Sequence, residues 1–160
     1  MGQLRVRDIM TTQVITLLGT DTVKDATITL AVDNLSGAPV VDDEYHLTGI
    51  LSESDILDLI MKYENELNMK DPVLHMLTFP MDSVIEDENI RVAAEKISTT
   101  KVEDLMQRTV LTTTPDALVI DVLRIMIDKD VNRVPVLEKG VLVGIVTRGD
   151  IIFSIYKRKV

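Results

Sequence analysis

The sequence predicts an α+β fold built from two tandem β-α-β-β-α motifs that pack with pseudo-twofold symmetry. The first observation is internal repetition: RVRDIM at residues 5–10 recurs as KVEDLM at 101–106, and GILSESDI at 49–56 recurs as GIVTRGDI at 144–151. The second is the local pattern of each copy, in which an apolar strand and a helix precede an apolar hairpin and another helix. Because one such sheet is too small to be stable alone, we expect the two copies to bury their apolar faces together.

The second hairpin shows this pattern most clearly. Val134–Leu137 suits a strand, and residues 141–146 form an apolar run typical of a strand that is buried on both faces. Between them, Lys139-Gly140 predicts a two-residue turn, because the glycine can adopt a positive φ angle. Thr147 follows the second strand and Asp150 stands at the start of the next helix. A hydroxyl and a carboxylate are therefore expected where backbone N–H groups and a helix dipole can meet a ligand.

Capping residues and apolar periodicity predict the other elements of the first copy. We expect a short strand at Val14–Leu17 and a helix over residues 23–34 that is capped by Thr20–Thr22. A hairpin over residues 38–51 and a helix that opens at Ser52–Asp55 complete this copy.

The second copy and the segment before it are predicted in the same way. We expect a strand at Val110–Thr113 and a helix capped by Thr114–Asp116. Motif 1 thus covers residues 1–67 and motif 2 covers residues 101–160. The helical insert between them, residues 68–100, is expected to hold a helical turn at 74–79 and an amphipathic helix at 87–98.

Composition excludes several classes of function. The 160-residue chain has a net charge of −9, which argues against nucleic-acid binding, and it has no cysteine, which excludes a disulfide scaffold and a thiolate metal site. His46 and His75 lack metal-like partner spacing, so no metal site is expected. No apolar run is long enough to span a membrane and the N-terminus lacks a signal-peptide core. We therefore expect a cytoplasmic protein without direct membrane insertion.

Taken together, the repeated segments resemble a known family. Each copy has a turn of the form V-x-D-h-M, where h is apolar, then h-P-h-h, a hairpin and G-h-h-[ST]-x-x-D-h. This signature is similar to that of a tandem pair of CBS domains, the module named after cystathionine β-synthase and also called a Bateman module. The resemblance covers nearly the whole chain except the insert. It implies a homodimer that binds AMP, ADP, ATP or S-adenosylmethionine in clefts between the two motifs, regulates another protein of unknown identity and carries no catalytic cofactor.

The resemblance also implies which residues bind the ligand. In the family, the aspartate of the last segment holds the ribose hydroxyls, the preceding Ser or Thr lies near the ribose or phosphate, adenine lies against the first strand of the opposite motif, and phosphates meet basic residues before the h-P segment. Carried onto this chain, the favoured cleft consists of Gln13, Val14, Ile15, Asn132, Arg133, Val134, Pro135, Thr147 and Asp150. A weaker second cleft consists of Ser52, Asp55, Thr109, Val110 and Leu111. Ser36-Gly37 stands there in place of Asn132-Arg133, which removes a cation.

Other interpretations stay open at this point. The spacing of Asp55 and Asp150 alone favours simple helix caps, and the resemblance shifts that balance toward a ligand for Asp150 while leaving Asp55 open. A structural dimerisation module without ligand binding is the alternative function. A stand-alone enzyme lacks support, because the sequence shows no nucleophile–base pair, metal cluster or P-loop. DNA binding rests only on Lys157-Arg158-Lys159, which is more typical of a solvated tail.

Overall fold

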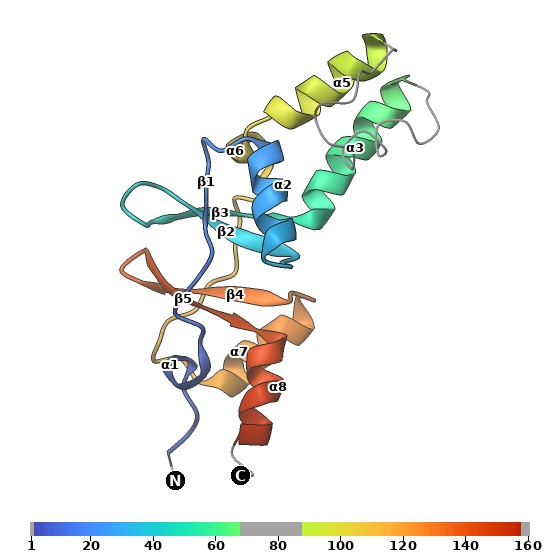
Figure 1. Cartoon of the computed structure of the whole chain (residues 1–160). Coiled ribbons are helices and arrows are strands. Elements are labelled where there is room, and N and C mark those ends of the chain that lie inside the picture. Colours follow the sequence, from blue (N-terminus) through green and yellow to red (C-terminus); the bar gives the residue numbers. More distant parts are fainter. Residues whose placement is uncertain (1, 68–87, 158–160) are drawn as a thin grey trace. The chain divides into compact units, whose positions relative to one another are not determined.

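The computed structural model describes residues 2–67 and 88–157, and Figure 1 shows its helices and strands. The chain divides into two compact units. Unit 1 comprises Met1–Thr16, Val41–Thr48 and Thr109–Val160, and unit 2 comprises Leu17–Val40 and Gly49–Arg108. Each unit therefore takes residues from both sequence copies.

Unit 2 contains the helices and strands of the first copy from β1 onward, helix α5 of the insert and the start of the second copy. Its elements are β1 (Leu17–Leu18), α2 (Val23–Val32), β2 (Gly37–Val41), β3 (Leu47–Ser52), α3 (Glu53–Leu67), α5 (Glu88–Thr99) and α6 (Val102–Leu105), with the hairpin tip of β2 and β3 assigned to unit 1. The three strands form a sheet in the order β1-β2-β3. Thr22 caps α2 as predicted, because its side chain accepts a hydrogen bond from the backbone N–H of Asp25 at 3.2 Å. The core is aliphatic and includes Leu17, Val23, Ala26, Leu30, Val40, Leu51, Ile97 and Val102.

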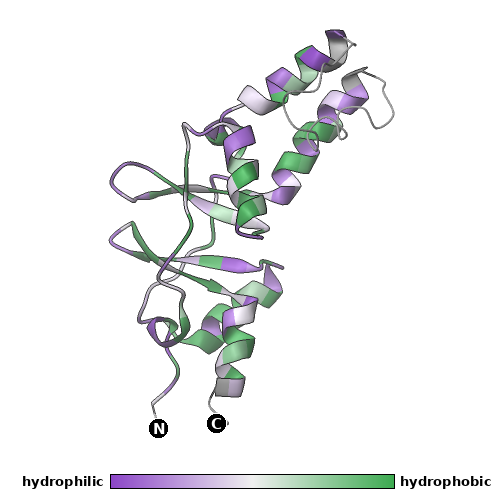
Figure 2. Ribbon diagram, viewed as in Figure 1, coloured by the Kyte–Doolittle hydropathy of each residue, from purple (hydrophilic) through white to green (hydrophobic). Residues whose placement is uncertain are grey.

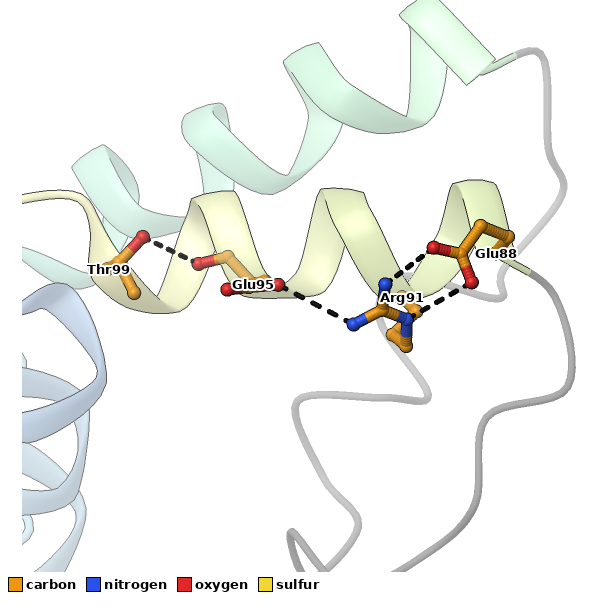
Figure 3. Close-up of polar contacts among 4 residues, drawn as sticks. All are labelled: Glu88, Arg91, Glu95 and Thr99. Carbon is orange, nitrogen blue, oxygen red and sulfur yellow. Dashed lines mark hydrogen bonds and ion pairs between the residues drawn. The ribbon is translucent and has the colours of Figure 1, made fainter.

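Helix α5 confirms the amphipathic helix expected near residues 87–98. Ala93 and Ile97 are buried on one face, and α5 packs against α2 and α3. The exposed face carries Arg91, which donates to Glu88 through Nε at 3.2 Å and lies 3.7 Å from a carboxylate oxygen of Glu95, as Figure 3 shows. The hydrogen bond from Arg91 lowers the pKa of Glu88 and raises that of Arg91. The helical turn expected at 74–79, with His75, lies outside the described residues.

Unit 1 contains the second hairpin and the helices around it. Its elements are α1 (Val6–Ile9), α7 (Val119–Asp128), β4 (Arg133–Glu138), β5 (Val141–Thr147) and α8 (Arg148–Lys157). Strands β4 and β5 are antiparallel, with Glu138 opposite Val141. The two residues between them, Lys139 and Gly140, have φ angles of 51° and 81°, which confirms the predicted turn. The core of the unit is formed by Val6, Val119, Val122, Met126, Val134, Val136, Val146 and Ile151.

The short strands expected at Val14–Leu17 and Val110–Thr113 do not form with these bounds. Strand β1 covers only Leu17–Leu18, and residues 110–113 contribute a single parallel bridge between Thr113 and Val136. In the first copy the pairing is divided, because Thr11 pairs with Ile145 in unit 1 whereas Leu17 belongs to the sheet of unit 2. A continuous strand over Val14–Leu17 therefore does not form.

The expected cap at Thr114–Asp116 is also wrong. Helix α7 begins at Val119, and its N-cap, Leu118, makes no side-chain capping bond. The cluster instead forms a turn that binds the N-terminal segment. The N–H of Arg7 donates to the Pro115 carbonyl at 2.9 Å, and the Arg7 guanidinium forms an ion pair with Asp116. Helix α7 thus begins past this cluster, and Pro115 and Asp116 contact α1 instead.

Candidate functional site

The Asp150 turn, defined as Thr147–Asp150, joins β5 to α8. The backbone N–H of Thr147 donates to Asp150 Oδ2 at 2.9 Å, and the backbone N–H of Asp150 donates to Thr147 Oγ1 at 3.1 Å. These two bonds form a reciprocal cap at the start of the helix, which explains why a hydroxyl and a carboxylate occur at this spacing. The Asp150 side chain is half-buried, and the positive end of the helix dipole favours its charge.

Thr11 reaches the same carboxylate from the N-terminal segment. Its hydroxyl donates to Asp150 Oδ1 at 3.2 Å, and its backbone exchanges two hydrogen bonds of 2.9 Å with Ile145. Gly144 makes this approach possible, since a Cβ there would lie 2.8 Å from Met10 Sδ and 3.1 Å from the Thr11 carbonyl oxygen. Sequence reasoning missed Thr11. The available signal was its position directly after the repeated D-h-M segment.

The other residues expected for the favoured cleft all belong to unit 1. Arg133 pairs with Thr147 across the hairpin, which places the start of β4 opposite the Asp150 turn, and the Asn132 carbonyl accepts from the N–H of Arg148 at 3.1 Å. Val134 and Pro135 are buried, so their side chains belong to the core. Any ligand contact from these two residues would therefore come from backbone atoms.

Gln13, Val14 and Ile15 follow Thr11 in the chain. Gln13 and Ile15 are exposed and Val14 is half-buried. The bond between Thr11 and Asp150 holds the beginning of this segment beside the turn. Sequence reasoning also missed Arg148, a cation within the turn, whose guanidinium donates to the Val131 carbonyl and to Asp130, both at 3.1 Å.

The Asp55 turn, defined as Ser52–Asp55, is the equivalent feature of unit 2. Asp55 Oδ2 accepts from the backbone N–H of Ser52 at 2.9 Å and from its hydroxyl at 3.1 Å. Asp55 Oδ1 accepts from the side-chain amide of Gln107 at 3.0 Å. Asp55 as a whole residue is only 8% exposed. Every one of these donors lies within unit 2.

The rest of the weaker cleft is divided between the units. Ser52 and Asp55 belong to unit 2, whereas Thr109, Val110 and Leu111 belong to unit 1. Unit 2 by itself therefore does not hold the full expected set. Within unit 2, Asp55 is contacted by Gln107 of the second copy, which sequence reasoning missed.

Other kinds of site have little support in residues 2–67 and 88–157. No group of three His, Cys, Asp or Glu side chains in these ranges is placed to hold a metal ion. His46 lies in the first hairpin, where its backbone N–H donates to Asp42 at 2.9 Å and helps to lower the pKa of that carboxyl. Of the helices that the structure describes, none has the length and apolar character needed to cross a membrane.

Comparisons with known proteins agree with the repeated architecture. A family profile for the CBS domain matches residues 6–62 and 102–157. The protein MJ1426 of Methanocaldococcus jannaschii is 33% identical over 149 residues, which make up 92% of this chain and 88% of that protein. Among solved structures, CBSX2 in complex with AMP is 26% identical with a TM-score of 0.71, covering 98% of both chains. CBSX2 is a CBS-pair protein from Arabidopsis thaliana.

A further solved structure supports the fold alone. The CBS domain pair of MJ0100, solved with 5′-methylthioadenosine and S-adenosylmethionine, has a TM-score of 0.68 at 23% identity, covering 98% of this chain and 99% of that chain.

Proposed function

Because the chain belongs to the CBS domain family as a tandem pair, we propose that it is a cytoplasmic regulatory module that binds an adenosine-containing nucleotide at the Asp150 turn. The candidate ligands are AMP, ADP, ATP and S-adenosylmethionine. AMP has the most direct support, since CBSX2 was solved with AMP. The nucleotide acts as a signal in this proposal, and no step of catalysis is assigned to the chain.

The observation that carries this proposal is the number of hydrogen bonds that the Asp150 carboxylate accepts. One of its oxygens accepts from the Thr147 N–H at 2.9 Å, and the other accepts from the Thr11 hydroxyl at the longer distance of 3.2 Å. A carboxylate has about four acceptor positions, so two of them can accept the vicinal hydroxyls of a ribose. Arg133 is paired with Thr147 at the entry of β4, and a guanidinium there suits the phosphate oxygens of a nucleotide.

A thermal-shift screen tests this proposal. The purified wild type and the Asp150→Ala variant are each heated without ligand and with AMP, ADP, ATP, S-adenosylmethionine, GTP or NADH. A ligand that binds the folded state stabilises it by about 2.7 kcal/mol at a concentration of 100 times its dissociation constant. We expect a clear rise in melting temperature with one or more adenosine ligands and loss of that rise in Asp150→Ala. A rise that is unchanged in the variant would place the ligand elsewhere.

We further propose that the chain acts as a homodimer. Helix α8 exposes Ile152, Ile155 and Tyr156 at 57%, 56% and 67%, and Figure 2 shows hydrophobic turns along this helix. Apolar side chains grouped on one helix are typical of an interface. Light scattering should give twice the mass of the chain, and Ile152→Glu combined with Ile155→Glu should give the monomer mass. A dimer that persists in this variant would contradict the use of α8.

The alternative function is a dimerisation module without ligand binding. The reciprocal bonds between Thr147 and Asp150 favour it, because they account for both side chains as a helix cap. If no nucleotide changes the melting temperature while the dimer is present, this alternative is the better account. Regulation of a partner requires that the nucleotide bind two states with different affinities.

A further inference from the structure

We propose that the side chain of Gln107 occupies the ligand position at the Asp55 turn, so that the chain binds one nucleotide, in unit 1. This inference rests on the proposed function of the Asp150 turn. It assigns Gln107 as the residue that decides how many nucleotides the chain holds.

Gln107 and Thr11 occupy equivalent backbone positions. Each follows the methionine of the repeated D-h-M segment, at Met106 and Met10. Gln107 exchanges backbone hydrogen bonds of 2.8 and 2.9 Å with Ile50, as Thr11 does at 2.9 Å with Ile145. The backbones are therefore held in the same way in both units, and the side chains make the difference.

The longer side chain fills more of the acceptor capacity of its carboxylate. Asp55 accepts from the Ser52 N–H, the Ser52 hydroxyl and the Gln107 amide at 2.9, 3.1 and 3.0 Å. Three of about four acceptor positions are thus filled. Asp150 accepts from the Thr147 N–H at 2.9 Å and from the Thr11 hydroxyl at the longer distance of 3.2 Å. The hydroxyl of Thr11 can rotate toward another acceptor, whereas the planar amide of Gln107 is aimed at Asp55.

Burial and the residue before each aspartate also make the Asp150 turn the more accessible of the two. Asp55 is 8% exposed, whereas Asp150 is half-buried. The residue directly before each aspartate is Ser54 in unit 2 and Gly149 in unit 1. A Cβ at Gly149 would lie 3.6 Å from Thr147 Oγ1, so its absence leaves that hydroxyl more accessible.

A ribose at the Asp55 turn must therefore displace a bond that the chain already makes. The two hydroxyls of a ribose and the amide of Gln107 are all hydrogen-bond donors that seek the same carboxylate. Loss of the hydrogen bond between Gln107 and the charged Asp55 should weaken ribose binding at this turn by about 10-fold to 100-fold, compared with a carboxylate that lacks this bond. Gln107 thus acts as an internal substitute for ligand hydroxyls.

The test is the number of nucleotides bound per chain, measured by isothermal titration calorimetry of the full chain with AMP and with adenosine. Adenosine is included because unit 2 has Ser36-Gly37 in place of Asn132-Arg133 and so lacks a cation for phosphate. We expect one site per chain in the wild type. Gln107→Thr copies the residue of unit 1 and should give a second site, which the double variant Gln107→Thr with Asp55→Ala should lose.

Two further variants complete the design. Gln107→Ala removes the amide without adding a hydroxyl and should also open the second site. The reciprocal change Thr11→Gln should weaken binding at the Asp150 turn by about 10-fold or more, because the amide now competes there. Both positions have exposed side chains and keep their backbone bonds, so the variants should fold.

The outcomes separate this inference from the function on which it rests. Two sites in the wild type, or one site in both Gln107 variants, would overturn the role of Gln107 and leave nucleotide binding intact. Absence of binding to the wild type and to every variant would overturn the proposed function and the inference with it. A gain of one site in Gln107→Thr that Asp55→Ala removes would support both.

Discussion

The Asp150 turn and the Asp55 turn have the same sequence pattern and different surroundings. In both, a hydroxyl residue at the end of a strand and an aspartate three residues later form hydrogen bonds at the start of a helix. In unit 1 a short threonine from the N-terminal segment meets the carboxylate, and in unit 2 a glutamine fills it more completely. The comparison teaches that the motif builds the helix cap in either case. In our proposal, a residue from the other sequence copy decides whether the carboxylate stays available to a ligand.

The largest expected effect on stability comes from substitution of Gly49 and Gly144, the glycines against which the segments of Gln107 and Thr11 pack. A Cβ at Gly49 would lie 2.6 Å from Met106 Sδ and 2.8 Å from the Gln107 carbonyl oxygen, whereas at Gly144 the nearest atoms are at 2.8 and 3.1 Å. Gly49→Ala should therefore destabilise the protein by about 3 kcal/mol and Gly144→Ala by about 1 to 2 kcal/mol. Urea unfolding measures both. Equal losses, or a larger loss for Gly144→Ala, would contradict the tighter approach in unit 2.

The second prediction compares the stability contributions of the two carboxylates. Asp55→Ala removes a buried acceptor and leaves the Gln107 amide and the Ser52 N–H without it, so it should cost about 2 kcal/mol. Asp150→Ala removes a half-buried cap and should cost about 1 kcal/mol. Urea unfolding of both variants without nucleotide gives the two values. A larger loss for Asp150→Ala would mean that its carboxylate is more fully used by the protein than its contacts suggest.

The smallest expected effect concerns the exposed charges of α5, which lie away from both turns. The hydrogen bond from Arg91 lowers the pKa of Glu88 below its ordinary value of 4.5. Because the pKa is lower in the folded state, the stabilisation is present above pH 4.5 and is lost as the pH falls through the folded-state pKa. Glu88→Gln should slightly lower the melting temperature at pH 7, and this difference should shrink as the pH falls below 4.5. A difference that persists at the acidic pH would have another cause.

Sequence reasoning predicted the elements whose evidence is local. The CBS pair and its α+β fold are confirmed, as are the Lys139-Gly140 turn and the Thr22 cap. It failed where a distant contact decides the structure. The cap expected at Thr114–Asp116 is absent, since α7 begins only at Val119, and Asp116 instead pairs with Arg7, 109 positions away in the sequence.

The same limit applies to the candidate site. Thr147, Asp150, Ser52 and Asp55 were identified from their spacing and from the family resemblance, and their assignment to a ligand stays a prediction. Thr11 and Gln107 were missed because they reach Asp150 and Asp55 across 139 and 52 residues of sequence. The repeat did place Thr11 and Gln107 at equivalent positions. The difference in side-chain length could not be interpreted from the sequence, because the sequence does not show that the two side chains contact Asp150 and Asp55.

The most direct test of the account is whether the ribose hydroxyls of a nucleotide are read by Asp150. AMP and 2′,3′-dideoxy-AMP are titrated into the wild type and into Asp150→Ala by calorimetry. The account predicts that the wild type binds AMP at least about 10-fold more tightly than the dideoxy compound, since bonds to a charged group are lost, and that the variant binds both equally weakly. Equal affinity of the wild type for the two compounds, or a preference for AMP that survives in Asp150→Ala, would contradict it.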